Sequence, residues 1–166
     1  MKLREDGFLL HSEQQEDQGA SRLSRQTLAF FLHTFFALGS WIALMLLGYA
    51  VNPAGVPQLA ILLLSIAVPL LVGLIVTKFH RSEMAEVVWL VGLIWILIVS
   101  LWVLDMPTGP NACLQCGATE KLTRTFFSLP GPSGLIDNDG PFLGTWPAAA
   151  LVGYSIGAWI GMRRRA

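Results

Sequence analysis

Charged side chains are scarce in this chain, and four long stretches contain none. Asp, Glu, Lys and Arg make up 13% of its 166 residues, against about 25% in a typical soluble protein. The uncharged stretches are residues 28–51, 59–77, 87–104 and 146–162. In a helix, roughly 20 apolar residues cover the ~30 Å hydrocarbon core of a bilayer. This scarcity of charge argues against an ordinary soluble domain and predicts an all-α integral membrane protein with four transmembrane helices.

The predicted spans also lack the groups that drive ion-coupled transporters and proton pumps, which place carboxylates or bases within the membrane. The sequence shows no phosphate-binding glycine loop, no Ser-His-Asp arrangement and no cluster of metal ligands. Its formal net charge is zero, so no overall basic character points to a nucleic-acid partner. These absences favour a non-catalytic protein.

Cysteine is equally scarce, since the chain contains only Cys113 and Cys116. Both belong to the loop between the third and fourth predicted spans. That loop has no histidine and no further cysteine, which disfavours a zinc site. On the oxidising side of a membrane, two thiols at this spacing either form a structural disulfide or exchange electrons. We predict the structural disulfide.

The same motif leaves a redox function open. Four spans with one Cys113-Leu-Gln-Cys116 motif resemble the small four-span thiol oxidoreductases of the cell envelope. The resemblance implies electron relay between two cysteine pairs and a quinone. This chain departs from that pattern because it has no second pair.

The distribution of basic residues predicts the orientation, because loops rich in Lys and Arg remain in the cytoplasm. With both termini inside, nine of the eleven basic residues are cytoplasmic, and two lie in the outer loop 105–145. We expect residues 1–27 to form a polar cytoplasmic tail and 28–104 a three-helix transmembrane meander. Residues 146–166 then form the fourth helix and a basic tail. The expected location is a bacterial inner membrane or its equivalent.

The outer loop, residues 105–145, is rich in proline and glycine and too long for a simple connector. We expect it to be structured. Residues 119–129 suggest a short amphipathic helix with Leu122, Phe126 and Phe127 toward the membrane. Residues 137–140 resemble a calcium turn but lack the downstream glutamate of a full calcium loop, so we interpret them as a turn.

The fourth predicted span carries a row of small residues. Ala149, Gly153, Gly157 and Gly161 recur every four residues, which places them along one face of a helix. Small residues at this spacing let two membrane helices approach closely. The packing partner is either another span of the same chain or a helix of another subunit, and the sequence leaves both alternatives open.

Two histidines lie toward the same predicted membrane face. His33 is inside the first span and His80 follows the second. Imidazoles on facing helices can ligate haem iron. The segment 29–41, with its small residue, His33 and Trp41, is also similar to antenna helices, and this resemblance implies a bacteriochlorophyll ligand at His33. The alternative is a histidine that hydrogen-bonds a neighbouring helix or a lipid headgroup.

We therefore expect a non-catalytic accessory or structural subunit of a larger membrane complex. An energy-converting complex, respiratory or photosynthetic, is the expected host. The chain would contact other integral membrane subunits through its fourth helix and loop 105–145, bind lipids and require no cofactor. The alternatives are a thiol-disulfide oxidoreductase using Cys113 and Cys116, and a haem- or chlorophyll-carrying subunit using His33.

Overall fold

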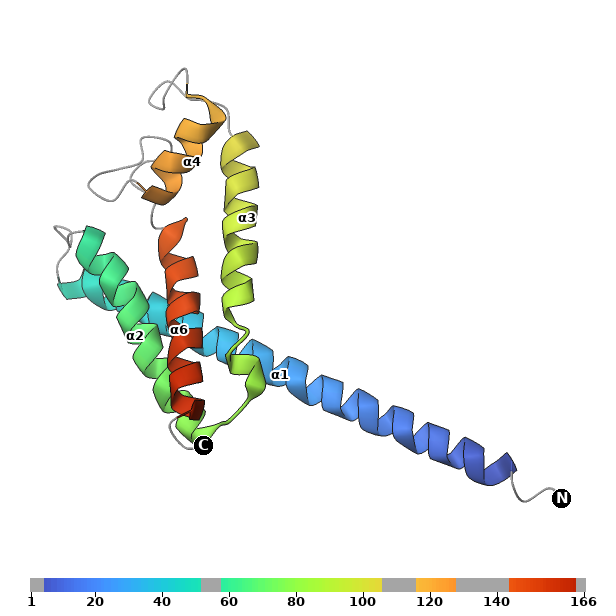
Figure 1. The fold of residues 1–166 in the computed structure, drawn as a ribbon. Helices are drawn as coiled ribbons and strands as arrows, with labels where there is room; N and C mark the ends of the chain where they lie inside the picture. The colour runs from blue at the N-terminus through green and yellow to red at the C-terminus, as the bar shows by residue number, and fades with distance from the viewer. Residues whose placement is uncertain (1–4, 52–57, 106–115, 128–143, 164–166) are drawn as a thin grey trace.

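The computed structural model describes residues 5–51, 58–105, 116–127 and 144–163, and all regular structure in them is helical (Figure 1). The elements are α1 Glu5–Val51, α2 Gln58–Phe79, the 3-10 turn η1 Glu83–Ala85, α3 Trp89–Asp105, α4 Ala118–Phe127 and α6 Thr145–Arg163. The prediction of an all-helical chain is therefore confirmed for the described residues.

Three segments are long and apolar enough to cross a membrane: Arg22–Gly48, Leu59–Phe79 and Glu83–Asp105. The fourth predicted span forms α6, which is not among them. Helix α6 is rich in glycine, alanine and serine, and most of its residues are buried against the other helices. A helix shielded by its neighbours requires less apolar surface than one that faces lipid. This explains why α6 is less hydrophobic than α2 and α3.

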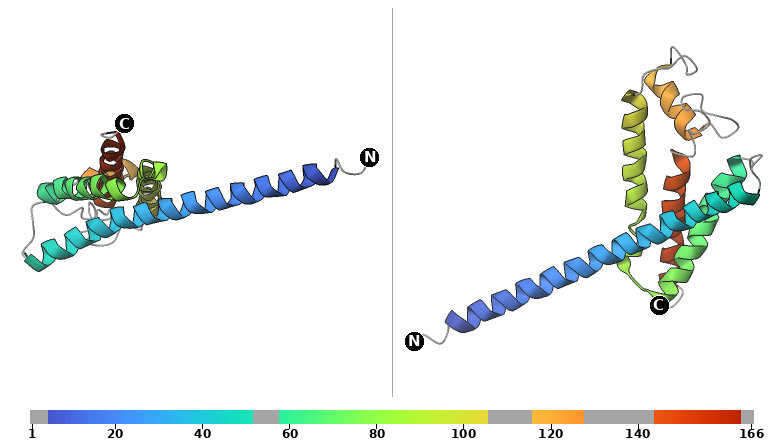
Figure 2. Two further views of the ribbon diagram at one scale, coloured as in Figure 1. Left: turned by 90° about the horizontal axis from the view of Figure 1, so that it is seen from below. Right: turned by 180° about the vertical axis from the view of Figure 1, so that it is seen from behind.

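Helix α1 begins well before the first predicted span, because most of the expected polar tail and that span form one continuous helix of 47 residues. Residues 5–27 contain no proline and are rich in good helix formers, so nothing in the sequence ends the helix before the membrane. The 27 residues of the apolar segment are about 40 Å long, more than the ~30 Å hydrocarbon core, which favours a tilted helix. Figure 2 shows α1 running obliquely across the other helices.

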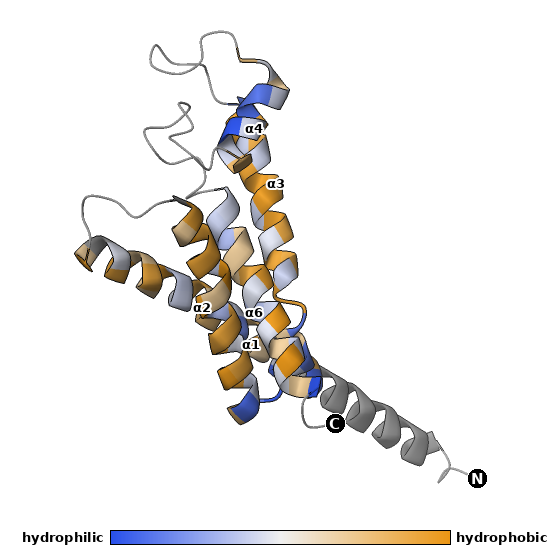
Figure 3. Cartoon of the chain, turned by 60° about the vertical axis from the view of Figure 1, so that its left-hand side comes forward, coloured by the Kyte–Doolittle hydropathy of each residue, from blue (hydrophilic) through white to orange (hydrophobic). Residues whose placement is uncertain are grey.

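Helix α6 is the central element of the bundle. It contacts α1, α2, α3, α4 and η1, and it lies between α2 and α3 in Figure 1. Its buried side chains complete two apolar clusters. The first contains Ala37, Ala85, Val88, Leu151, Tyr154 and Ala158, and the second Trp41, Trp146 and Ala150. Strongly hydrophilic residues gather at α4 and at the opposite end of the bundle, where α2 ends (Figure 3).

Side chains of α6 also anchor its neighbours at their ends. The backbone amide of Trp89 donates a hydrogen bond of 2.9 Å to Ser155 Oγ. The first amides of a helix have no partner within that helix, so Ser155 supplies a cap for α3 from another element. Thr145 Oγ1 donates to the Phe126 carbonyl at 2.5 Å, which ties the end of α4 to the start of α6.

Candidate functional site

The small residues of α6 pack directly on the backbone of α2. At three glycines, a side chain as small as a methyl group would overlap an oxygen of α2. The overlapping atoms are Ile66 O at Gly153, Leu70 O at Gly157 and Thr77 Oγ1 at Gly161. Of the two partners left open by the sequence, the structure thus shows a helix of the same chain. We call this contact the glycine seam. Ala149, at the start of the row, is half-buried.

A fourth glycine completes the seam from the other side. Gly73 belongs to α2, and a Cβ added there would overlap the carbonyl oxygen of Tyr154 and lie 3.1 Å from the Ala158 nitrogen. Gly73 was not predicted from the sequence, although a glycine among the leucines and valines of the second span was a usable signal. Gly39 and Gly48 of α1 behave differently, because an added Cβ meets no atom within 4 Å at either position.

His33 of α1 is joined to Tyr154 of α6 by a buried hydrogen bond. The His33 Nδ1 and the Tyr154 phenol oxygen are 2.6 Å apart, and both side chains have 0% exposure. The sequence analysis did not single out Tyr154. One of only two tyrosines in the chain, it carries a polar group inside an apolar span, and this was the signal available. The arrangement matches the alternative in which His33 bonds a neighbouring helix.

His80 lies directly after α2, and its ring centroid is 5.7 Å from that of His33. The structure therefore brings together the two histidines that the sequence analysis named. His80 is exposed and His33 is buried, so the pair connects the surface of the bundle to its interior. Haem at the two histidines and bacteriochlorophyll at His33 remain predictions. Because the His33 ring is covered by protein, a macrocycle would reach it only after the surrounding helices separated.

The second ring nitrogen of His33 is unpaired. Nε2 is buried and has no hydrogen-bond partner. A neutral imidazole has one N–H donor and one acceptor nitrogen. If Nδ1–H donates to Tyr154, Nε2 is an acceptor without a donor. If the phenol donates to Nδ1, Nε2–H is a donor without an acceptor. Either tautomer leaves one buried polar atom unmatched, which is unusual in a folded protein.

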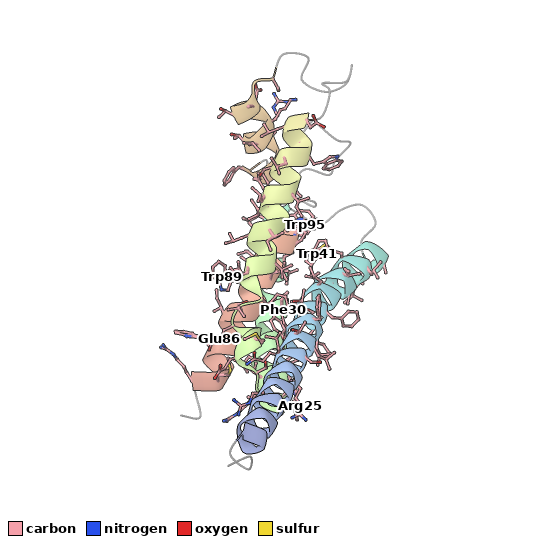
Figure 4. All side chains as sticks on the ribbon, turned by 90° about the vertical axis from the view of Figure 1, so that its right-hand side faces the viewer. Arg25, Phe30, Trp41, Glu86, Trp89 and Trp95 are labelled. Atoms are coloured by element: carbon pink, nitrogen blue, oxygen red, sulfur yellow. The ribbon has the colours of Figure 1, made fainter. Side chains whose placement is uncertain are left out.

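Trp89 and Trp95 of α3 are exposed, whereas Trp41 of α1 is buried in the core. Arg25, Phe30 and Trp41 follow one another along α1, and Trp89 and Trp95 follow one another along α3 (Figure 4).

Two predicted features fall partly or wholly outside the described residues. Cys116 lies two residues before α4, whereas Cys113 is outside the described residues, so the disulfide and its role remain predictions. The turn at 137–140 is also outside them. The predicted amphipathic helix at 119–129 corresponds to α4, which carries an ion pair of 2.7 Å between Arg124 and Glu120 on its exposed side.

Within the described residues, no three His, Cys, Asp or Glu side chains are grouped so that they could hold a metal ion together. The candidate site residues that the structure brings together are those of the glycine seam and His33 with Tyr154 and His80. Comparison with protein families, curated proteins and solved structures finds no match for this chain.

Proposed function

We propose that this chain is a non-catalytic structural subunit of a larger integral membrane complex. The observation that carries the proposal is the glycine seam, because it closes the centre of the described bundle by direct contact of backbones. Transporters and enzymes require a cavity with convergent polar groups. A seam in which a single methyl group does not fit is instead suited to a rigid element that holds its neighbours in place.

The buried polar side chains of the described residues support the same reading. Four of the five are hydrogen-bonded, two within their own helix and two to another helix. The pairs are His33 with Tyr154, Thr77 with the Gly73 carbonyl, Thr125 with the Lys121 carbonyl, and Ser155 with the Trp89 amide. The bonds of His33 with Tyr154 and of Ser155 with the Trp89 amide fix helices to one another. No Asp, Glu, Lys or Arg is among the buried residues that the structure describes.

The proposal includes a membrane topology with four crossings and both termini in the cytoplasm. Helices α2 and α6 end, and α3 begins, at one end of the bundle, while α4 lies at the other (Figure 1). The first end carries Lys78, Arg81 and Arg163, the last residue of α6. The positive-inside rule favours the cytoplasm for this end and the outer side for α4.

The contact with other subunits is proposed for α6 and loop 105–145. The glycine face of α6 is occupied by α2, so another subunit would have to use the opposite face. Val152, Ile156 and Trp159 lie on that face and are 42–43% exposed. Their spacing of four and three residues places them on one side of the helix. Bound lipids would cover the remaining apolar surface, and no cofactor is required.

An energy-converting complex, respiratory or photosynthetic, is the host that we propose. The test is mild detergent extraction of tagged wild-type chain and of Ile156→Trp, followed by native electrophoresis and mass spectrometry of co-migrating proteins. We expect the wild type to migrate with other integral membrane subunits, and the variant to remain folded but to lose them. A wild-type chain that migrates alone would overturn the proposal.

A further inference from the structure

We propose that His33 and His80 form a binding site for one divalent transition-metal ion of the zinc or copper class. The site lies beside the end of α2, where an exposed imidazole stands next to a buried one. The inference is independent of the role as a structural subunit. It rests on two observations, which are the separation of the two rings and the unpaired Nε2 atom of His33.

The separation of the rings fits a shared ion. A metal–nitrogen bond of about 2.0–2.1 Å places the centroids of two coordinated imidazoles about 5 Å apart in tetrahedral geometry and about 6 Å apart in a linear arrangement. The observed centroid distance between His33 and His80 is 5.7 Å, which lies between these limits. Imidazole nitrogen is a favoured ligand of Zn²⁺, Cu²⁺ and Ni²⁺.

The unpaired nitrogen supplies the second argument. Histidine ligands characteristically donate their other ring N–H to a nearby acceptor, which fixes the tautomer and turns the free lone pair toward the metal. Tyr154 is placed for this role, since its phenol oxygen lies 2.6 Å from His33 Nδ1. In that tautomer Nε2 carries a lone pair with no donor. A metal ion would satisfy it, and Tyr154 would act as a positioning residue.

The surroundings of His33 and His80 determine the expected affinity for the metal ion. No third His, Cys, Asp or Glu of the described residues completes a cluster, so water would occupy the remaining coordination positions. Lys78 and Arg81 flank His80 in the sequence, but both are exposed, and solvent screens their repulsion. We therefore expect micromolar affinity. A bound ion would tie α1 to the turn that follows α2.

The test uses the full chain, purified without a polyhistidine tag in mild detergent. Zn²⁺ is titrated by calorimetry, and Cu²⁺ is followed by electron paramagnetic resonance, in which bound nitrogens split the signal. The variants are His80→Ala, which alters an exposed side chain, and Tyr154→Phe, which removes only the positioning hydroxyl. His11→Ala is the matched control, because it removes the third histidine of the chain and leaves the pair intact.

We expect one Zn²⁺ per chain and a copper spectrum with two coordinated nitrogens. His80→Ala should weaken zinc binding at least tenfold and leave one nitrogen, Tyr154→Phe should weaken it about tenfold, and His11→Ala should bind as the wild type does. Equal binding by the wild type and His80→Ala would overturn the proposal. A copper spectrum of the wild type with a single coordinated nitrogen would also overturn the proposal. So would the absence of zinc binding at Zn²⁺ concentrations up to about 100 times the expected micromolar dissociation constant.

Discussion

Gly157→Ala tests the glycine seam with the smallest possible change. The added methyl carbon would overlap the carbonyl oxygen of Leu70 and would lie 2.8 Å from its carbonyl carbon and 3.0 Å from its Cα. All three are backbone atoms, so no side chain can rotate away. Helices α2 and α6 must separate, and the contacts at Gly153 and Gly161 loosen with them. Overpacking of this kind costs about 1–3 kcal/mol.

Helix propensity acts in the opposite direction, because alanine favours a helix over glycine by about 1 kcal/mol. We expect the clash to exceed the gain in helix propensity, since it is spread along the whole seam, and we expect a net destabilisation of up to about 2 kcal/mol. Gly157→Leu should be more severe. The assay is thermal unfolding in mild detergent, followed by circular dichroism. Gly39→Ala is the control, because the new methyl group meets open space and should leave stability equal or higher. If Gly157→Ala and Gly39→Ala unfold at the same temperature, the glycine seam does not exclude a methyl group and the prediction is wrong.

Three further predictions concern other parts of the chain. Tyr154→Phe removes the partner of a buried imidazole and should destabilise the fold by about 1–3 kcal/mol, measured by the same thermal assay, and an unchanged melting temperature would contradict the hydrogen bond. Replacing Cys113 and Cys116 by serine should lower stability or expression without affecting the chemistry of the host complex. Loss of electron transfer to a quinone or a partner thiol, with normal assembly, would favour the oxidoreductase instead. A reporter that works only in the cytoplasm should be active when it is fused after Ala166. Activity at that position of a reporter that works only on the outer side would reject the topology.

The helices were predictable because their signals are local. Long uncharged runs indicate spans, and small residues four apart in α6 indicate that a helix packs on Gly153, Gly157 and Gly161. What the row could not specify is which helix packs there, because α1, α2 and α3 are all apolar. The pairing with α2 depends on Gly73, which allows the approach from the other side.

The parts that sequence reasoning missed depend on the relative rotation of distant helices. The His33 and Tyr154 partners are 121 residues apart, and their contact depends on how α1 crosses α6. The continuation of α1 back to Glu5 was missed for a different reason. The polarity of residues 5–27 marks where the chain leaves the apolar segment, but it does not end a helix, because Glu, Gln, Arg and Leu are all good helix formers.

The mass and composition of the assembly that contains this chain in native membranes test the central claim most directly. Native mass spectrometry after mild detergent extraction measures both. The account predicts a complex in which this chain is present at fixed stoichiometry with different integral membrane subunits. A chain that is released alone, or only with copies of itself, would contradict the account.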